Sequence, residues 1–265
     1  MVVGGGAAGF FAAITCAEAR PDAEVTILEK SAQVLGKVRI SGGGRCNVTH
    51  ACFDARELTT RFPRGERELL GPCQSFQARD TVAWFEARGV RLKTENDGRM
   101  FPVTDSSQTI IDCLVNAAKA AGVKMVANRG VAAVAREPGG GFRLTLANGE
   151  VLACDRLLLA TGGCRGAAAG ELAVSLGHTL APPVPSLFTF HVETGWVRDL
   201  AGVSVESTVV SVPDTKLREQ GALLLTHWGL SGPVILRLSA WGARTLHGLD
   251  YRFPLQINWL PRLSA

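Results

Sequence analysis

Three glycines near the N-terminus, Gly4, Gly6 and Gly9, have the G-x-G-x-x-G spacing of a phosphate-binding turn. In such a turn the first glycine makes the tight bend, the second lets the backbone approach a pyrophosphate, and the third lets the following helix pack close to the strand. Glu29 lies about 20 residues further on, where a carboxylate accepts hydrogen bonds from ribose hydroxyls and disfavours a 2′-phosphate. These four residues predict a site for a dinucleotide without a 2′-phosphate.

The elements around these residues are those that such a site needs. Residues 1–3 are typical of the end of a buried strand, and residues 24–29 predict a second strand that ends on Glu29. The alanine-rich run 7–19 predicts a helix that begins at Ala7 and Ala8, with its first amides directed at the phosphates. A glycine-rich turn by itself has an ordinary structural alternative, but strand, loop, helix, strand and acid in this order favour nucleotide binding.

Residues 35–49 form a second glycine-rich loop, because three consecutive glycines do not belong inside a stable helix or strand. Its amides and cations suit the pyrophosphate or ring system of a long cofactor. The alternative is a surface linker, against which the polar side chains and the thiol at 45–47 argue. The candidate cofactor contacts here are Lys30, which follows Glu29, and Lys37, Ser41, Gly42, Gly43, Gly44, Arg45, Cys46 and Asn47.

The stretch ISGGGRCNVT at 40–49 resembles the signature of the aminoacetone-oxidase-like family of bacterial NAD(P)/FAD-dependent oxidoreductases, which includes bile-acid enone reductases. Residues 95–103, 159–163 and 225–236 are similar to further motifs of that family, in the same order. The resemblance implies FAD held in an extended form by a glutathione-reductase-like Rossmann domain, with a second domain over the flavin and NAD(P)H as a possible transient co-substrate. It also implies an adenine contact at Val131 and a second cofactor turn at Ala160, Thr161, Gly162 and Gly163.

Hydrophobic periodicity predicts an α/β fold for residues 1–181. Two amphipathic helical runs and a short apolar strand repeat the alternation of a parallel sheet; they cover 75–89, 107–121 and 123–126. Three strand-like runs separated by glycine turns then predict an antiparallel β-meander at about 131–154. Its 139–141 glycines precede no helical pattern, so a hairpin turn is favoured over a phosphate loop. Residues 156–163 predict a return strand that is buried on both faces.

The proline-rich segment 182–186 marks the start of a second, incomplete and mainly β domain, 182–265. Its expected strands and helix are 187–192, 203–212, 221–226 and 234–241. His227 is a weak candidate for a proton donor, and a packing or capping histidine is the favoured alternative. Members of the resembled family continue past the equivalent of Ala265, begin with a longer first strand and have a longer loop after 163, so we expect a fragment at both ends.

Composition and charge argue against several other classes of protein. The net charge is only +4 and the cations are scattered, so neither nucleic-acid binding nor tRNA modification is favoured. No run of about 18 apolar residues and no leader pattern is visible, which fits a cytoplasmic protein. Seven cysteines without a C-x-x-C pair argue against a disulfide framework. Cys46, His50 and Cys52 lack a second ligand pair, so no metal site is expected.

The expected function is that of an FAD-dependent oxidoreductase, which passes hydride between a small organic substrate and the flavin, with NAD(P)H or oxygen completing the cycle. One alternative is a dehydrogenase with a single NAD site, although such a fold does not need the meander or the motif at 159–163. The other is a nucleotide-binding fragment without catalytic activity. The substrate, the catalytic residues and the oligomeric state do not follow from the sequence.

Overall fold

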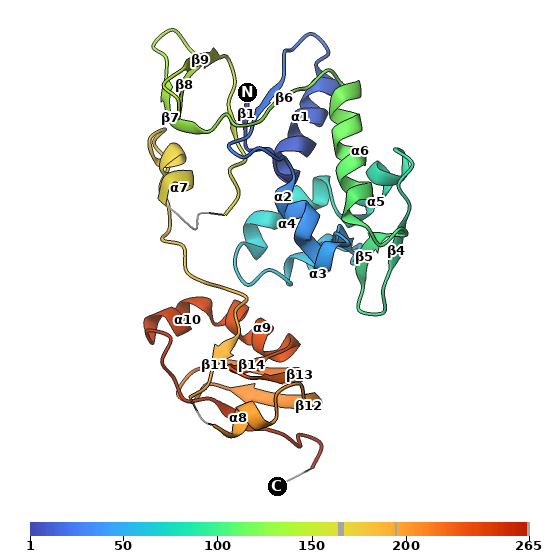
Figure 1. The fold of residues 1–265 in the computed structure, drawn as a ribbon, viewed down its shortest axis with the longest axis vertical. Helices are drawn as coiled ribbons and strands as arrows, with labels where there is room; N and C mark the ends of the chain where they lie inside the picture. The colour runs from blue at the N-terminus through green and yellow to red at the C-terminus, as the bar shows by residue number, and fades with distance from the viewer. Residues whose placement is uncertain (164–166, 194, 264–265) are drawn as a thin grey trace. The chain divides into compact units, whose positions relative to one another are not determined.

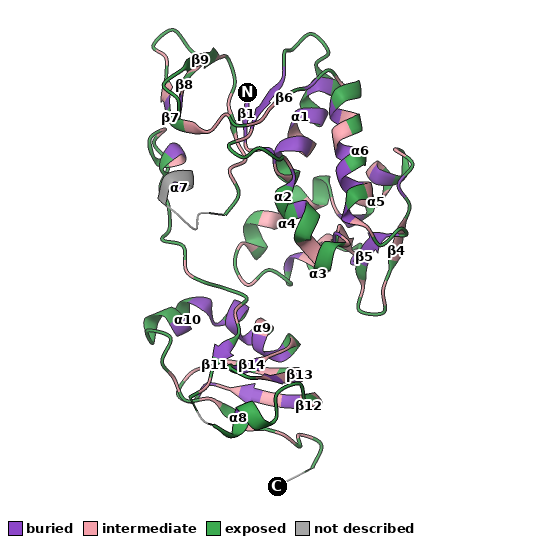
Figure 2. Ribbon diagram, in the orientation of Figure 1, coloured by how far each residue is buried: buried purple, intermediate pink, exposed green. Residues whose placement is uncertain are grey.

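The computed structural model describes residues 1–163, 167–193 and 195–263, and it divides the chain into two compact units, Met1–Ala181 and Pro182–Ala265 (Figure 1). Figure 2 shows buried residues inside both units.

Unit 1 contains a four-stranded parallel sheet in the order β10-β1-β2-β6. The strands are β1 (Val2–Val3), β2 (Thr26–Leu28), β6 (Lys124–Val126) and β10 (Leu158–Leu159). Helix α1 (Ala7–Ala19) follows β1, and α6 (Ser107–Ala120) precedes β6. Apolar side chains of both helices and of the sheet share one core, which includes Phe10, Ile14, Ile27, Ile110 and Leu114. This arrangement confirms the predicted Rossmann-like α/β fold.

Between β2 and α6 the chain forms short elements that the sequence analysis largely missed. They are α2 (Gly36–Ile40), the 3-10 turn η1 (Ser41–Gly44), β3 (Thr49–His50), α3 (Ala55–Thr59), α4 (Glu66–Ser75), α5 (Ala78–Glu86), β4 (Leu92–Thr94) and β5 (Arg99–Pro102). Strands β3, β5 and β4 make a small antiparallel sheet. The predicted glycine loop is therefore one helical turn followed by a tight turn, in which Gly42 and Gly43 have left-handed φ values of 55° and 69°.

The β-meander is present as predicted, with β7 (Val131–Arg136), β8 (Phe142–Leu146) and β9 (Val151–Cys154) paired antiparallel. Its inner residues share a core with Val3, Leu28 and Leu172, the last from α7 (Ala167–Val174). The prediction for 156–163 was wrong in its burial and length. Within the described ranges β10 pairs with β1 alone, at the edge of the sheet, and Leu158 keeps 42% of its surface exposed.

Unit 2 is an antiparallel five-stranded sheet in the order β11-β14-β13-β12-β15, which confirms the mainly β prediction. Its strands are β11 (Phe190–His191), β12 (Ser204–Ser211), β13 (Arg218–Thr226), β14 (Gly229–Ser231) and β15 (Gln256–Asn258). Helix α9 (Pro233–Trp241) packs on β13 and β12, and α8 (Trp196–Asp199) and α10 (Ala243–Gly248) complete the unit. The core includes Val210, Leu223, Leu225, Ile235 and Leu238.

Candidate functional site

The three glycines of the first loop have different surroundings. At Gly4, where φ is +114°, an added Cβ would lie 2.3 Å from the carbonyl oxygen of Ala160. At Gly9 it would lie 1.9 Å from the carbonyl oxygen of Gly4, so the helix could not pack this close to the strand. At Gly6 an added Cβ would meet no described heavy atom within 4 Å, apart from its chain neighbours and its own helix. Gly4 and Gly9 therefore serve packing, whereas Gly6 leaves open space at the start of α1, where a phosphate would approach.

The N-terminus of α1 suits an anion. Its N-cap is Gly6, which has no side chain to accept hydrogen bonds from the first amides. The first helical bond runs from Phe10 N–H to the Gly6 carbonyl at 3.0 Å. The first turn contains no acidic residue, and Ala7 and Ala8 are exposed. The early amides of a helix have no partner within the helix and carry the positive end of its dipole. Small side chains leave these amides accessible to a pyrophosphate.

Glu29 lies directly after β2 and connects this strand to the glycine loop. Its Oε2 accepts a hydrogen bond from Gly5 N–H at 2.7 Å, and its Oε1 accepts one from Ser31 N–H at 2.9 Å. Each carboxylate oxygen still has a lone pair for a ribose hydroxyl. The half-buried carboxylate thus ties the end of β2 to the glycine loop, and its contact with a ribose stays a prediction.

A pocket of about 140 Å³ lies beside Glu29, at the carboxyl ends of β1 and β2. Ligands of open α/β sheets bind at this edge. The pocket brings together five residues that the sequence predicted, Gly4, Glu29, Lys30, Val131 and Thr161. It also includes residues that the sequence analysis missed: Val3, Leu28, Arg129, Gly130 and Leu172.

The missed residues Arg129 and Gly130 reach the pocket because the chain after β6 folds back against the end of β2. Arg129 N–H donates to the Glu29 carbonyl at 2.8 Å. A Cβ on Gly130 would lie 3.3 Å from the Cβ of Lys30, so this approach is close. In the sequence, the signal for this contact is only that both residues directly precede the meander.

Lys37 brings the second glycine-rich loop close to the turn at 160–163. Its Nζ lies 3.3 Å from the position of a Cβ on Gly162 and 4.0 Å from that on Gly163. Ala160 N–H donates to the Val3 carbonyl at 2.8 Å, which fixes the start of that turn beside β1. Lys37 is exposed and forms no ion pair within the described part of the chain. Its positive charge is available to an anion at this edge of the sheet.

Arg45 has partners within unit 1. Its Nη1 lies 2.5 Å from Glu95 Oε1 and 3.5 Å from Asp105 Oδ1, and its guanidinium lies over the Phe101 ring at 4.0 Å. The hydrogen bond that Arg45 donates to the Glu95 carboxylate is the main cause that raises the pKa of Arg45. The guanidinium therefore links the glycine turn to the β4–β5 hairpin, and its expected contact with pyrophosphate stays a prediction.

The other loop candidates divide into buried and exposed positions. Ser41 Oγ donates to the Val38 carbonyl at 2.9 Å, and burial raises the pKa of the Cys46 thiol. Gly43, Gly44 and Asn47 are exposed. Gly42 packs so closely that an added Cβ would lie 2.7 Å from the Asn47 nitrogen. The turn thus presents backbone and one amide side chain outward, and keeps the thiol inside.

His227 lies at the exposed tip of the β13–β14 hairpin in unit 2, with its ring edge-on to Trp228 at 4.7 Å. This contact is what a packing histidine makes, and the role of His227 as a proton donor stays a prediction.

His50 Nε2 lies 3.0 Å from the Asp97 carbonyl oxygen, and the described residues hold no group of three potential metal ligands. No helix in the described ranges is long and apolar enough to cross a membrane.

Comparisons with known proteins give this chain several relatives. It is 29% identical over 273 residues to the 3-dehydro-bile acid delta(4,6)-reductase of Clostridium scindens, a match that covers 100% of this chain and 65% of the relative. It is also 29% identical over 250 residues to the ribosomal RNA dihydrouridine synthase of Escherichia coli, covering 91% of this chain and 60% of that protein. The chain thus spans somewhat less than two thirds of the length of these relatives.

Among solved structures, an open conformation of a flavocytochrome c3 fumarate reductase matches with a TM-score of 0.48 and 19% identity, over 77% of this chain and 46% of that one. The model of the HI0933-like protein Rossmann domain matches residues 1–246. The more specific aminoacetone-oxidase-like assignment stays a prediction. Because the match covers nearly the whole sequence, the chain belongs to the HI0933-like Rossmann domain family.

Proposed function

We propose that this chain binds FAD in unit 1 as part of an FAD-dependent oxidoreductase. The observation that carries the proposal is the hydrogen-bonded Glu29 carboxylate beside a pocket at the carboxyl ends of β1 and β2. The open space at Gly6 supports it. These features fit an adenosine diphosphate with free ribose hydroxyls. The membership in the HI0933-like family supports the same proposal.

Features beyond a minimal dinucleotide site favour FAD over NAD. The meander lines the pocket through Val131, and the turn at 160–163 lies beside Lys37. The residues that would hold the cofactor are the glycine loop, Glu29, Lys30, Lys37, Val131 and that turn. When bound, the flavin would supply the electron pair as a hydride. The protein residues would fix the adenosine and neutralise the pyrophosphate.

The names of the relatives suggest a class of substrate. One is a delta(4,6)-reductase and another a dihydrouridine synthase, and both names describe addition of hydrogen across a carbon–carbon double bond. We propose the same reaction here: a hydride adds to one carbon of a double bond conjugated to a carbonyl, and a proton adds to its neighbour. NAD(P)H supplies the electrons for the next cycle. Oxygen is the alternative acceptor when the reaction runs as an oxidation.

Binding of FAD is tested with Glu29→Gln and a matched control, Glu24→Gln, which removes an exposed carboxylate paired with Lys124. We expect the purified chain to bind FAD with a shifted visible spectrum, Glu29→Gln to weaken binding at least tenfold, and Glu24→Gln to change it less than twofold. Equal affinities in the two variants would contradict the assignment of the site. Bleaching of bound flavin by NADH or NADPH then tests the electron donor.

The two remaining alternatives give different results in the same experiment. A dehydrogenase with a single NAD site binds NAD and stays colourless with FAD. A fragment without catalytic activity binds FAD or ADP but never passes electrons to a substrate.

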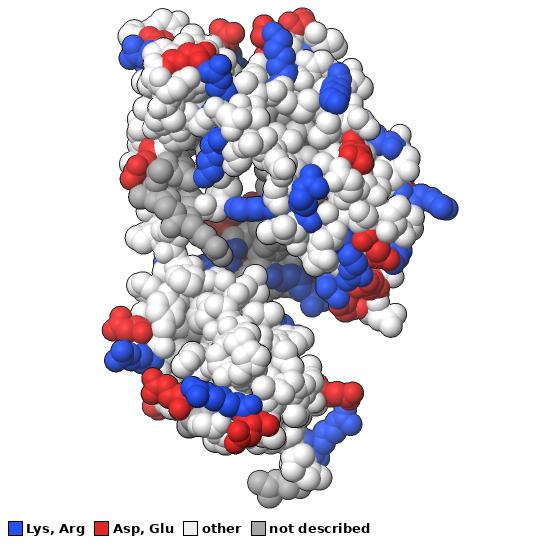
Figure 3. Space-filling view, in the orientation of Figure 1, with Lys and Arg blue, Asp and Glu red and all other residues white. Residues whose placement is uncertain are grey.

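A second candidate substrate is RNA, because the dihydrouridine synthase has the same 29% identity to this chain as the bile-acid reductase, over a somewhat shorter match. Against it, the net charge is only +4, and Figure 3 shows acidic as well as basic side chains across the visible face. We therefore propose that the substrate is a small molecule and that the protein does not bind nucleic acid. We also propose that it acts in the cytoplasm. Turnover of a steroid enone but not of uridine-containing ribosomal RNA is the expected result, and the reverse would establish RNA as the substrate.

A further inference from the structure

The sheet of unit 2 has an odd number of strands. All its neighbouring strands are antiparallel, in the order β11-β14-β13-β12-β15, so its two edge strands, β11 and β15, run in the same direction. Each of them is paired on one side only within the described ranges. One further strand, antiparallel to both, would close this sheet into a six-stranded antiparallel barrel.

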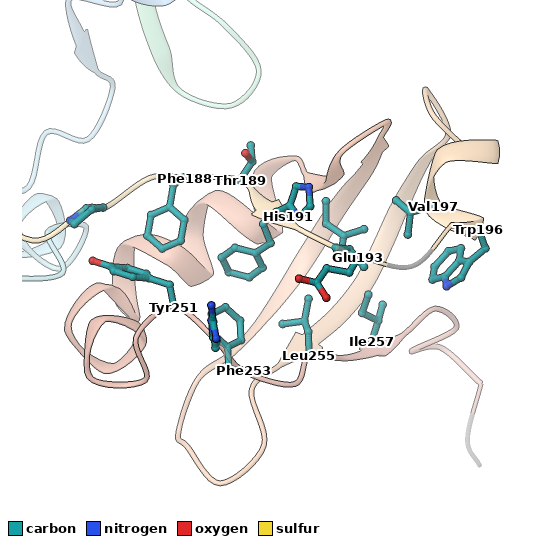
Figure 4. A pocket seen from close by; sticks show the side chains of 15 residues that line it. Phe188, Thr189, His191, Glu193, Trp196, Val197, Tyr251, Phe253, Leu255 and Ile257 are labelled. Carbon is teal, nitrogen blue, oxygen red and sulfur yellow. The ribbon is translucent and has the colours of Figure 1, made fainter.

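A groove of about 1040 Å³ lies between the two edges. One side is formed by residues 188–193 and the other by residues 251–257 (Figure 4). The rings of Phe188 and Tyr251 are 5.7 Å apart, and those of Phe190 and Phe253 are 5.2 Å apart. Side chains from the two edges therefore meet at the base of the groove, although the strands are not paired with each other.

Both sides of the groove have a strand pattern that is longer than their paired residues. Over 188–193 the buried or half-buried residues are Phe188, Phe190 and Val192, and they alternate with exposed residues, but only Phe190–His191 are paired. Over 253–259 half-buried and exposed residues also alternate, but only Gln256–Asn258 are paired. This alternation is typical of strands with one buried face. Each edge therefore has the side-chain pattern for a longer ladder than the one it forms here.

The backbone of β11 also faces the groove. Val192 N–H donates to the Trp228 carbonyl at 3.1 Å, so Val192 and Phe190 direct their backbone groups toward β14. In an antiparallel ladder the residues between them direct their N–H and C=O groups to the opposite side. Thr189 and His191 therefore present backbone donors and acceptors to the open edge, where an added strand would pair.

We propose that this groove binds an extended polypeptide strand from outside these 265 residues, antiparallel to β11 and β15, with alternate apolar side chains packed against the aromatic base. The matched relatives support a polypeptide occupant, because 65% and 60% of their lengths correspond to this chain and the rest lies outside the match. Main-chain hydrogen bonds to both edges would give the strand its affinity, and the apolar groove its preference for an alternating sequence.

The probe is a set of labelled 15-residue peptides that tile the part of the Clostridium scindens relative outside the match. We expect at least one to bind, as measured by fluorescence anisotropy, and to slow hydrogen exchange of the amides at 189 and 191. His191→Pro removes an outward N–H while the β14 ladder keeps its own bonds. It should weaken binding at least tenfold, whereas His191→Ala should change it less than twofold.

Thr189→Pro with Thr189→Ala repeats the test at the other outward amide, in case His191→Pro does not fold. The proposal is overturned if no peptide binds, or if the proline and alanine variants bind equally well. It is also overturned if the groove instead mediates dimers of this chain, which sedimentation at increasing concentration would reveal.

Discussion

An added methyl group should affect FAD binding at one glycine of the first loop and protein stability at another. At Gly6 it enters open space, so Gly6→Ala should change the free energy of unfolding by less than about 1 kcal/mol. It should nevertheless reduce FAD affinity about tenfold or more, because it occupies the approach of the pyrophosphate. Gly9→Ala places the methyl group against the Gly4 carbonyl and should lower the free energy of unfolding by about 1–3 kcal/mol. Urea unfolding and FAD titration separate these effects, and equal stability of the two variants would contradict them.

The cysteines should differ in reactivity with iodoacetamide. Burial is the main cause that raises the pKa of Cys46 and Cys113, whereas Cys16 is exposed. A raised pKa lowers the thiolate fraction at pH 8, and burial also restricts access. Peptide mass spectrometry should therefore find Cys16 alkylated before Cys46 and Cys113, whose rates should still rise with pH above the usual cysteine pKa. In urea, where the chain is unfolded, the three cysteines should react at equal rates. Equal rates in the native protein would contradict the prediction.

Individual residues differ in how well the sequence predicts them. Gly4, Gly6, Gly9 and Glu29 belong to one local pattern, whose spacing predicts their roles. Arg129 depends on a backbone bond to Glu29 across a long stretch of chain, and no local pattern encodes that contact. The partners of Arg45 are hidden for the same reason, since a sequence shows a charge but not the carboxylate that folding places beside it.

Among the elements, helix α1 begins without an acidic residue or a side-chain cap. Ala8→Asp should stabilise the protein without FAD by about 0.3–1 kcal/mol, because a carboxylate interacts favourably with the positive end of the helix dipole. The same carboxylate should repel the pyrophosphate and reduce FAD affinity at least tenfold. Ala8→Asn has nearly the same shape without the charge and is the control. If both variants reduce FAD affinity equally, the helix N-terminus does not act through charge.

The sequence predicts those elements whose apolar residues repeat with a clear helical or strand period and whose ends are marked by turn residues. Helix α6 has an apolar stripe, and the meander strands are separated by glycine turns. Helix α4 contains Pro72 and has no buried residue, so neither composition nor periodicity identifies it. The exposure of β10 was missed because an apolar run predicts a buried strand and does not show whether that strand lies at the edge of its sheet.

In the whole molecule, the cores of the two units contain no common residue. Ile14→Ala in unit 1 and Leu238→Ala in unit 2 each remove a fully buried side chain, and each should lower the free energy of unfolding of its own unit by about 2–5 kcal/mol. Hydrogen exchange should accelerate only in the unit that carries the substitution, and the effects should add in the double variant. Faster exchange in both units after either substitution would contradict independent cores.

Strand β1 lies between β2 and β10, and Val2 is paired with Leu158. During synthesis from the N-terminus, one side of β1 therefore waits for a partner until most of unit 1 has been made. At about 5–20 residues per second this delay is about 10–30 s. Nascent chains stalled with 150 residues outside the ribosome should retain no FAD and should recruit chaperones, whereas those with 200 residues outside should retain the cofactor. Strand β1 is thus made long before its partner β10, and one of its edges stays open to other strands in the interval.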